Sequence, residues 1–154
     1  MAANTAPIYP LTPAAFFADF TAKTACTTRA PTVTASLAAA NVFVLVPAGA
    51  AQTPASTAGT RIDKIQVEGA STSITAPTAS QIVTIWWWDG TTAWVFDEIA
   101  ITVVTPSTTA VAFQGFKTYT NLVLPVGHAL YASTTITTTA ATTAFTVSAV
   151  GGTY

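Results

Sequence analysis

Short apolar and β-branched runs alternate with Gly-, Pro-, Ser- and Thr-rich stretches along most of this chain, from residue 41 onward. Within several runs the apolar residues recur at every second position, which is typical of half-buried β-strands. The runs lie at 42–46, 61–68, 110–116, 118–124, 129–136 and 145–149, with two more in a hairpin over 81–102. About eight strands without a long helical pattern predict an all-β fold, a jelly-roll-like β-sandwich with an extended N-terminal arm.

The hairpin has the strongest pattern, QIVTIWWWDGTTAWVFDEIAIT, with Asp89-Gly90 as the turn signal between its strands. Neighbouring residues of a strand point to opposite faces. Any loop with an even number of residues between the two strands therefore assigns the same side chains to each face of the hairpin. The face predicted to lie in the core contains Val83, Ile85, Trp87, Trp94 and Phe96. The opposite face contains Ile82, Trp86, Trp88 and Val95.

The pairing across the hairpin depends on the length of its loop. A loop from Asp89 to Thr92 places Trp87 near Trp94. The same loop places Ile85 near Phe96. Further along the second strand, Ile99 and Ile101 have the opposite parity from Trp94 and Phe96. A slip of one residue at Asp97-Glu98 brings both sets to one face, so we expect a β-bulge or a break there.

Trp86 and Trp88 are candidate interaction residues, because an apolar face with two indoles needs a cover. Exposed tryptophans can stack on sugar rings, as in carbohydrate-binding modules. They can also anchor a protein interface, where Trp is enriched in buried hot spots. The third interpretation is that the chain's own arm or loops cover both residues.

Residues 1–40 differ from the sandwich domain predicted for residues 41–154. Prolines at positions 7, 10, 13 and 31 interrupt this segment, and no long alternation occurs in it. Its aromatic and aliphatic candidates for interaction are Ile8, Tyr9, Phe16, Phe17 and Phe20. Thr12-Pro13 is also compatible with the start of a short helix. An arm of this kind either caps its own sandwich or reaches onto a neighbouring subunit.

The composition is compatible with a compact all-β domain, and it favours a protein that is packed against other proteins. Charged residues make up 7% of the 154 residues and hydrophobic residues 51%, while threonine accounts for about a fifth. Isolated charges would be costly to bury in such contacts. The net charge of −1 provides no basic surface for nucleic acid. No apolar run approaches the ~18 residues of a membrane span, and the N-terminus lacks a signal-peptide pattern, so we expect synthesis in a cytoplasm.

Candidate chemistry is sparse. Asp97 and Glu98 are adjacent carboxylates; on a regular strand they face opposite ways, whereas at a bulge they could approach each other. His128 stands beside a predicted turn without a nearby sequence partner, and a metal site normally needs three or four ligands. Cys26 is the one cysteine and is expected to be a buried or half-buried filler. We therefore expect no enzyme activity, no metal and no cofactor.

Several strand and turn segments together resemble small structural proteins of tailed bacteriophages and prophages. These segments are TRIDKIQVEG, the turn DG, FDEIAITVVTPS, NLVLPVGHALYAST and the terminal SAVGGTY. The resemblance covers about residues 42–154 and is greatest to head decoration, or cement, proteins. The chain departs from that pattern in its tryptophan run and in Thr153, where an acidic residue is usual.

This resemblance implies a virion protein on the capsid surface that binds the major capsid protein and bridges its subunits. A trimer is implied by analogy alone. The alternatives are a carbohydrate-binding or host-adhesion module that uses exposed Trp residues, and a connector or tail component of the same virion.

Overall fold

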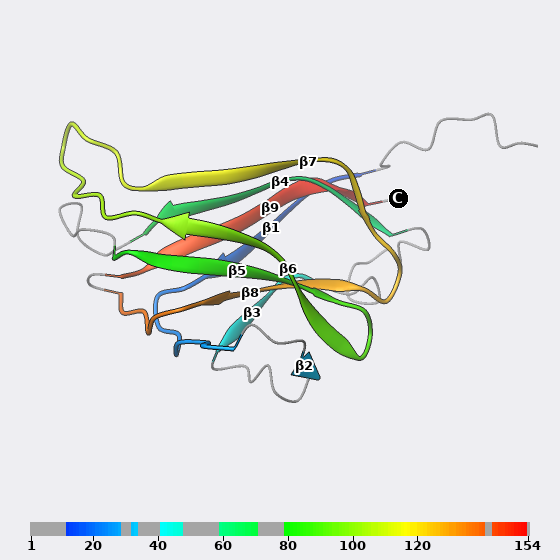
Figure 1. Cartoon of the computed structure of the whole chain (residues 1–154). Helices are drawn as coiled ribbons and strands as arrows, with labels where there is room; N and C mark the ends of the chain where they lie inside the picture. Colours follow the sequence, from blue (N-terminus) through cyan, green and yellow to red (C-terminus); the bar gives the residue numbers. More distant parts are fainter. Residues whose placement is uncertain are drawn as a thin grey trace, which may run out of the picture.

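The computed structural model describes residues 12–28, 32–33, 41–47, 59–70, 79–140 and 143–153 of the chain. Within this part, nine β-strands form two antiparallel sheets that lie face to face (Figure 1). The strands are β1 (Thr12–Asp19), β2 (Thr32–Val33), β3 (Val42–Val46), β4 (Thr60–Gly69), β5 (Gln81–Trp88), β6 (Thr92–Ile101), β7 (Gln114–Leu124), β8 (Ala129–Thr134) and β9 (Phe145–Thr153). The predicted all-β sandwich is confirmed.

The strand order is that of a jelly roll. One sheet has the order β1-β9-β4-β7, and the other has the order β2-β6-β5-β8-β3. Apart from the two-residue β2, the pairs nest around one hairpin: β5 with β6, then β4 with β7, β3 with β8 and β1 with β9. Folding one long antiparallel hairpin over on itself produces this nesting, which is the double Greek key of an eight-stranded jelly roll.

The hydrophobic core lies between the two sheets, and every second residue along the strands points into it. In β4, Ile65 and Val67 are fully buried, whereas Gln66 between them faces away from the core. Phe20, which follows β1, stacks on Phe145 of β9 with ring centroids 4.5 Å apart. The buried residues of this core include Ile62, Val83, Ile85, Ile99, Ile101, Leu124, Leu130 and Val147.

Residues 12–19, in the segment predicted to be an arm, form an edge strand of the four-stranded sheet. β1 pairs with β9 along its whole length, from Thr12 opposite Thr153 to Asp19 opposite Thr146. Because side chains alternate along a strand, Phe16 packs against the core while Phe17 points outward and is 75% exposed. The alternative of a short helix is wrong, because the pairing with β9 satisfies the backbone in an extended conformation.

The two strands predicted at 110–116 and 118–124 are in fact one strand, β7. Gly115 is not a terminator, because it lies inside β7 opposite Val67. A Cβ at this position would lie 2.8 Å from the ring of Phe113. The glycine therefore makes room for an aromatic ring and does not form a turn.

The hairpin contains the predicted β-bulge, one residue earlier than expected. Trp87 lies opposite Trp94, as the longer loop predicts. The register shifts between Ile85 and Trp86, so that Ile85 faces Asp97 and Phe96 is the extra residue of β6. The expected proximity of Ile85 and Phe96 is therefore replaced by a pairing of Ile85 with Asp97.

A second irregularity lies where β4 passes β9. Ile62 lies opposite Gly151 and Lys64 opposite Val150, so Asp63 is an extra residue of β4 at this point. A Cβ at Gly151 would overlap the carbonyl oxygen of Arg61. Only glycine allows the two backbones to approach this closely.

The substitution Gly151→Ala is expected to destabilise the protein by about 3 kcal/mol, because a backbone oxygen cannot move aside as a flexible side chain would. Gly127→Ala is the matched control. Gly127 has a φ of 83°, and a Cβ added there would meet no other atom, so only the left-handed backbone resists the change, at a cost of about 1–2 kcal/mol. Denaturant unfolding of both variants measures the difference. Equal losses would show that β4 and β9 separate easily at the bulge.

Candidate functional site

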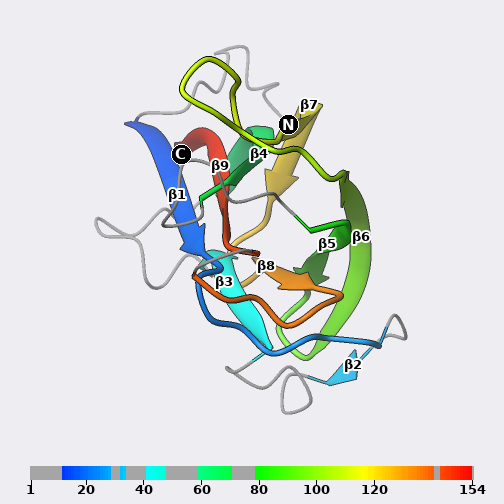
Figure 2. The same cartoon turned by 90° about the vertical axis from the view of Figure 1, so that its left-hand side faces the viewer.

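The outer face of the five-stranded sheet holds Trp86, and the chain itself covers this residue. Trp86 is 0% exposed and packs with Cys26, Val42 and Ala93. Its indole Nε1 donates to Ser133 Oγ at 2.8 Å. Figure 2 shows the segment after β1 crossing this face on the side away from the core. The Cys26 backbone N–H of that segment donates to the Thr134 carbonyl at 2.8 Å.

The sequence leaves three possible covers for the two tryptophans: a sugar, another protein or the chain itself. At Trp86 the cover is a segment of the chain itself. A fully buried, hydrogen-bonded indole presents no surface to a sugar or to another protein. Trp88 lies at the rim of the same cluster and is half-buried. Its ring meets the Tyr131 ring edge-on, with centroids 6.2 Å apart. Burial raises the pKa of Tyr131 above its ordinary value.

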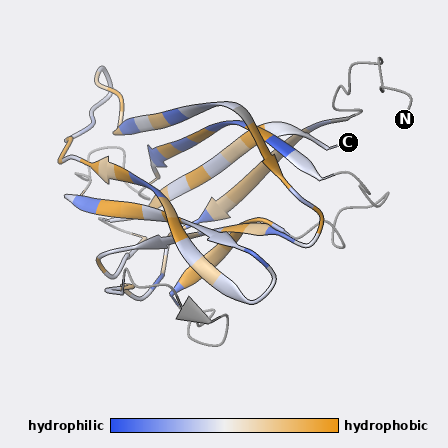
Figure 3. Ribbon diagram, turned by 45° about the vertical axis from the view of Figure 1, so that its right-hand side comes forward, coloured by the Kyte–Doolittle hydropathy of each residue, from blue (hydrophilic) through white to orange (hydrophobic). Residues whose placement is uncertain are grey.

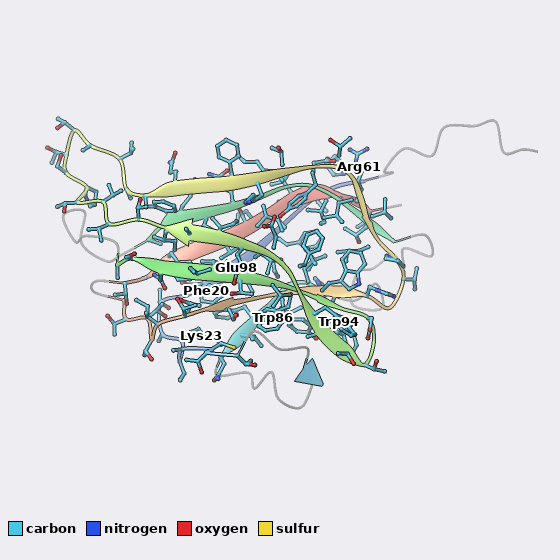
Figure 4. All side chains as sticks on the ribbon, in the orientation of Figure 1. Phe20, Lys23, Arg61, Trp86, Trp94 and Glu98 are labelled. Atoms are coloured by element: carbon cyan, nitrogen blue, oxygen red, sulfur yellow. The ribbon has the colours of Figure 1, made fainter. Side chains whose placement is uncertain are left out.

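Trp94 is the tryptophan that the fold leaves exposed. The parity of the hairpin predicts it in the core, but 48% of it is accessible, and it lies close to the β5–β6 turn (Figure 4). The alternation along the strand predicts correctly on which side of the sheet Trp94 lies. However, Trp94 lies only two residues into β6, at the end of the sandwich. We define the hairpin end as Asp89 to Trp94 together with the exposed Val126 of the β7–β8 turn, which leads into β8 where Ala129 pairs with Trp88.

Asp89 organises the hairpin end through four hydrogen bonds, one of them from the Thr91 hydroxyl to Oδ1 at 3.0 Å. Its Oδ1 accepts from the backbone N–H groups of Thr91 at 2.9 Å and Thr92 at 2.8 Å. Its Oδ2 accepts from Trp94 Nε1 at 2.9 Å. The Thr92 N–H, followed by the Trp94 indole and the Thr91 N–H, holds the pKa of Asp89 well below its usual range. The turn carboxylate thus fixes the orientation of the exposed indole.

Behind Trp94, a chain of aromatic rings fills the space where β6 approaches β7. The ring centroids of Trp87 and Phe96 are 5.8 Å apart, and those of Phe96 and Tyr119 are 5.6 Å apart. His128 closes the other end of this chain. Its Nδ1 accepts a hydrogen bond of 2.8 Å from Trp87 Nε1, so the histidine has a structural partner.

The carboxylates of Asp97 and Glu98 bind different partners. Asp97 accepts from the Tyr119 hydroxyl at 2.9 Å and lies 3.4 Å from Lys117 Nζ. Burial, followed by the hydrogen bond to Asp97, raises the pKa of Tyr119 well above its ordinary value. Glu98 accepts instead from the Thr84 hydroxyl at 3.4 Å. Asp97 therefore ties β6 to β7 across the edge of the sandwich.

The outer face of the four-stranded sheet carries two more exposed aromatic residues. Phe17 on β1 is 75% exposed and Phe116 on β7 is 62% exposed. One row of cross-strand neighbours joins them through Ser148 and Gln66. Figure 3 shows polar and apolar residues alternating along the strands of this sheet. We call this surface the outer sheet face: it comprises Ala15, Phe17, Asp19, Lys64, Gln66, Glu68, Gln114, Phe116, Thr118, Thr146, Ser148 and Val150.

The polar part of the outer sheet face runs along β4. Lys64 Nζ donates to Gln66 Oε1 at 2.5 Å, and Gln66 Nε2 donates to Glu68 Oε1. The Lys64 ammonium also lies 4.9 Å from the centroid of the Phe116 ring. At the end of the strand, Arg61 Nη2 donates to Asp63 Oδ2 at 3.0 Å.

The candidate residues from the N-terminal segment separate in the structure. Phe20 is buried in the core, Phe16 packs against the core, and Phe17 is exposed. Ile8 and Tyr9 lie outside the described residues. Phe116 is not among the residues that the sequence singles out, although the alternation Gln114, Phe116, Thr118 places it with polar neighbours.

Comparisons with known proteins add no assignment: no protein-family model and no curated protein matches the sequence. In the part of the chain that the structure describes, no helix is long and apolar enough to cross a membrane. The same residues contain no group of three or more His, Cys, Asp or Glu side chains placed to hold a metal ion. Cys26 is buried, as expected for a filler.

Ser133→Ala is expected to destabilise the protein by about 1–3 kcal/mol, because the Trp86 Nε1–H is left buried without an acceptor. Ser80→Ala, at an exposed position, is the control and is expected to change stability by less than about 0.5 kcal/mol. Urea unfolding monitored by tryptophan fluorescence measures both. If Ser133→Ala were as mild as the control, the cover over Trp86 would have to admit water.

Asp89 gives the protein an acid-dependent contribution to stability. Because its pKa is lower in the folded chain than in the unfolded chain, this contribution is complete above the unfolded value of about 3.9 and is lost as the pH falls below it. Asp89→Asn is therefore expected to lower Tm at pH 7 and to reduce the fall of Tm between pH 5 and pH 2. Calorimetry across this range measures the effect, and parallel curves for variant and wild type would contradict it.

Proposed function

We propose that this protein is a structural component of a tailed-phage virion, which decorates the capsid and stabilises it by bridging capsid subunits. The support is the resemblance of its strand and turn segments to head decoration proteins, together with the jelly-roll fold. A decoration protein acts through contact area and copy number, so it needs docking surfaces and no reactive centre.

The observation that carries the proposal is the presence of two separate exposed apolar surfaces on one rigid sandwich. Phe17 and Phe116 lie on the outer sheet face, whereas Trp94 lies at the hairpin end. A protein that bridges two neighbours needs two such surfaces, while a protein that binds one partner needs only one. The low charge of the chain agrees with burial of both surfaces in an assembly.

The hairpin end is the better candidate for contact with the capsid. Tryptophan is enriched among residues that dominate binding energy, particularly where it is held rigidly before binding. Asp89 holds Trp94 in this way through the hydrogen bond to its indole. The rest of the contact would come from Val126 and the neighbouring backbone of the two turns.

The test is to add the purified protein back to emptied capsids of the parent virion that lack it. We expect saturable binding in many copies per particle and a higher temperature of capsid disruption. Trp94→Ser is expected to weaken binding at least about tenfold. Val111→Ser is the control, because Val111 is 74% exposed in the loop before β7, away from the hairpin end.

The result that contradicts the proposal is failure of the wild-type protein to bind these capsids. A stoichiometry of a few copies per particle would assign the protein to a connector or to the tail. The exposed indole of Trp94 beside the Asp89 carboxylate is also what a carbohydrate-binding module would use. Binding of glycans in solution that Trp94→Ser abolishes would favour that function instead.

A further inference from the structure

The outer sheet face lacks a cover among the described residues, in contrast to the outer face of the other sheet. Its two phenyl rings stand on the edge strands β1 and β7, while the central strands present Ser148 and Gln66 in the same row. The two phenyl rings therefore stand at the edges of the face, and polar side chains occupy its middle.

Charge on this face is divided between its two ends. Lys64 lies on one side of the row that contains Phe17, Gln66 and Phe116. Glu68 lies on the other side, with Asp19 in the same row as Glu68 across β9. Arg61 and Asp63 at the far end of β4 neutralise each other. The row on one side of the central row thus carries one positive charge, on Lys64, and the row on the other side carries two negative charges, on Glu68 and Asp19.

A face with this pattern is complementary to itself in one orientation. Rotation by 180° about the central row reverses the strands and exchanges the two charged rows. Lys64 of one copy then faces Glu68 of the second copy, and the reverse contact forms at the same time. Phe17 of one copy then lies opposite Phe17 of the other, and Phe116 lies opposite Phe116, so the two rings of each pair meet side by side at the axis. Rotation about the strand direction would instead place the row of Lys64 opposite the same row of the second copy, and the row of Glu68 opposite its own counterpart.

The area of the face suits a stable dimer. Four strands spaced ~4.8 Å apart, with β4 running for ten residues at ~3.3 Å each, cover roughly 600 Å² of projected surface. Two copies would then bury at least about 1,200 Å² in total, which is the lower limit for standard specific interfaces.

We propose that the outer sheet face is a homodimer interface, in which two copies pack their four-stranded sheets face to face about a two-fold axis along the Phe17–Phe116 row. The occupant is a second copy because Lys64 of each copy lies opposite Glu68 of the other, while Asp19 at the edge of the sheet lies opposite Ala15. This inference does not rest on the capsid role, since dimerisation is a property of the purified chain. It differs in symmetry from the trimer that the family resemblance implies.

The experiment measures the mass of the purified full chain in solution, by sedimentation equilibrium from about 1 to 200 μM at physiological salt. We expect a monomer–dimer equilibrium. Lys64→Glu is expected to raise the dimer Kd at least about tenfold, because it places carboxylates opposite each other twice in the interface. The exchange Lys64→Glu with Glu68→Lys restores opposite charges and is expected to return Kd to within about threefold of wild type.

Two further variants guard against indirect effects. Lys23→Glu makes the same change in net charge next to Phe43, on the side of the other sheet, and is expected to leave Kd unchanged. Phe116→Ser removes one exposed phenyl ring without touching the core and is expected to weaken the dimer. Circular dichroism confirms the fold of each variant.

The proposal is overturned by a monomer at all concentrations, by a trimer, or by a dimer that Lys64→Glu leaves intact. Failure of the double exchange to restore association would also overturn it. A monomer whose binding to capsids is lost in Phe116→Ser would show that the capsid is the occupant of this face. That result would support the proposed function and contradict the homodimer. A dimer that does not bind capsids would support the homodimer and contradict the proposed function.

Discussion

The antiparallel pairing of β5 with β6 is the constraint on which the rest of the sandwich depends. The pairs β4·β7, β3·β8 and β1·β9 close successively around this hairpin, so an error of register at its turn would be passed to strands far apart in the sequence. Asp89 sets that register, because its carboxylate binds the two N–H groups that define the turn. The hydrogen bond to Trp94 adds a side chain from the second strand to the same network.

The bulge at Phe96 keeps the core continuous along this hairpin and links the two sheets at their edge. Near the turn, Trp87 and Phe96 pack against the core, and beyond the bulge Ile99 and Ile101 continue the same buried side. Without the extra residue, one of these sets would face solvent. The bulge also directs Asp97 toward β7, where Tyr119 and Lys117 bind it. A local irregularity thus keeps the core continuous and joins the two sheets at their edge.

The outer faces of the two sheets are covered to different extents by other segments of the chain, and the proposed function depends on this difference. The segment after β1 is hydrogen-bonded to β8 and seals Trp86. No comparable segment among the described residues lies over the outer sheet face, where Phe17 and Phe116 are exposed. That side of the sandwich is therefore closed over Trp86, while Val44 and Val95 in the same row remain exposed. The exposed aromatic rings lie on the other sheet and at the hairpin end.

The sequence by itself determined the all-β class, the β3 strand at 42–46, the hairpin and its turn, and the need for a bulge next to Asp97. These features depend on local alternation and on turn residues, which act over a few neighbouring positions. The tertiary structure alone decided that residues 12–19 are a strand, that Gly115 lies within one, and that Trp86 is buried while Trp94 is exposed. Each of these depends on a contact between segments that pack together only in the fold: β1 with β9, Phe113 with Gly115, and Cys26 with Thr134. Parity assigns a side chain to a face of a sheet, but only the fold decides what covers that face and how far the core extends along it.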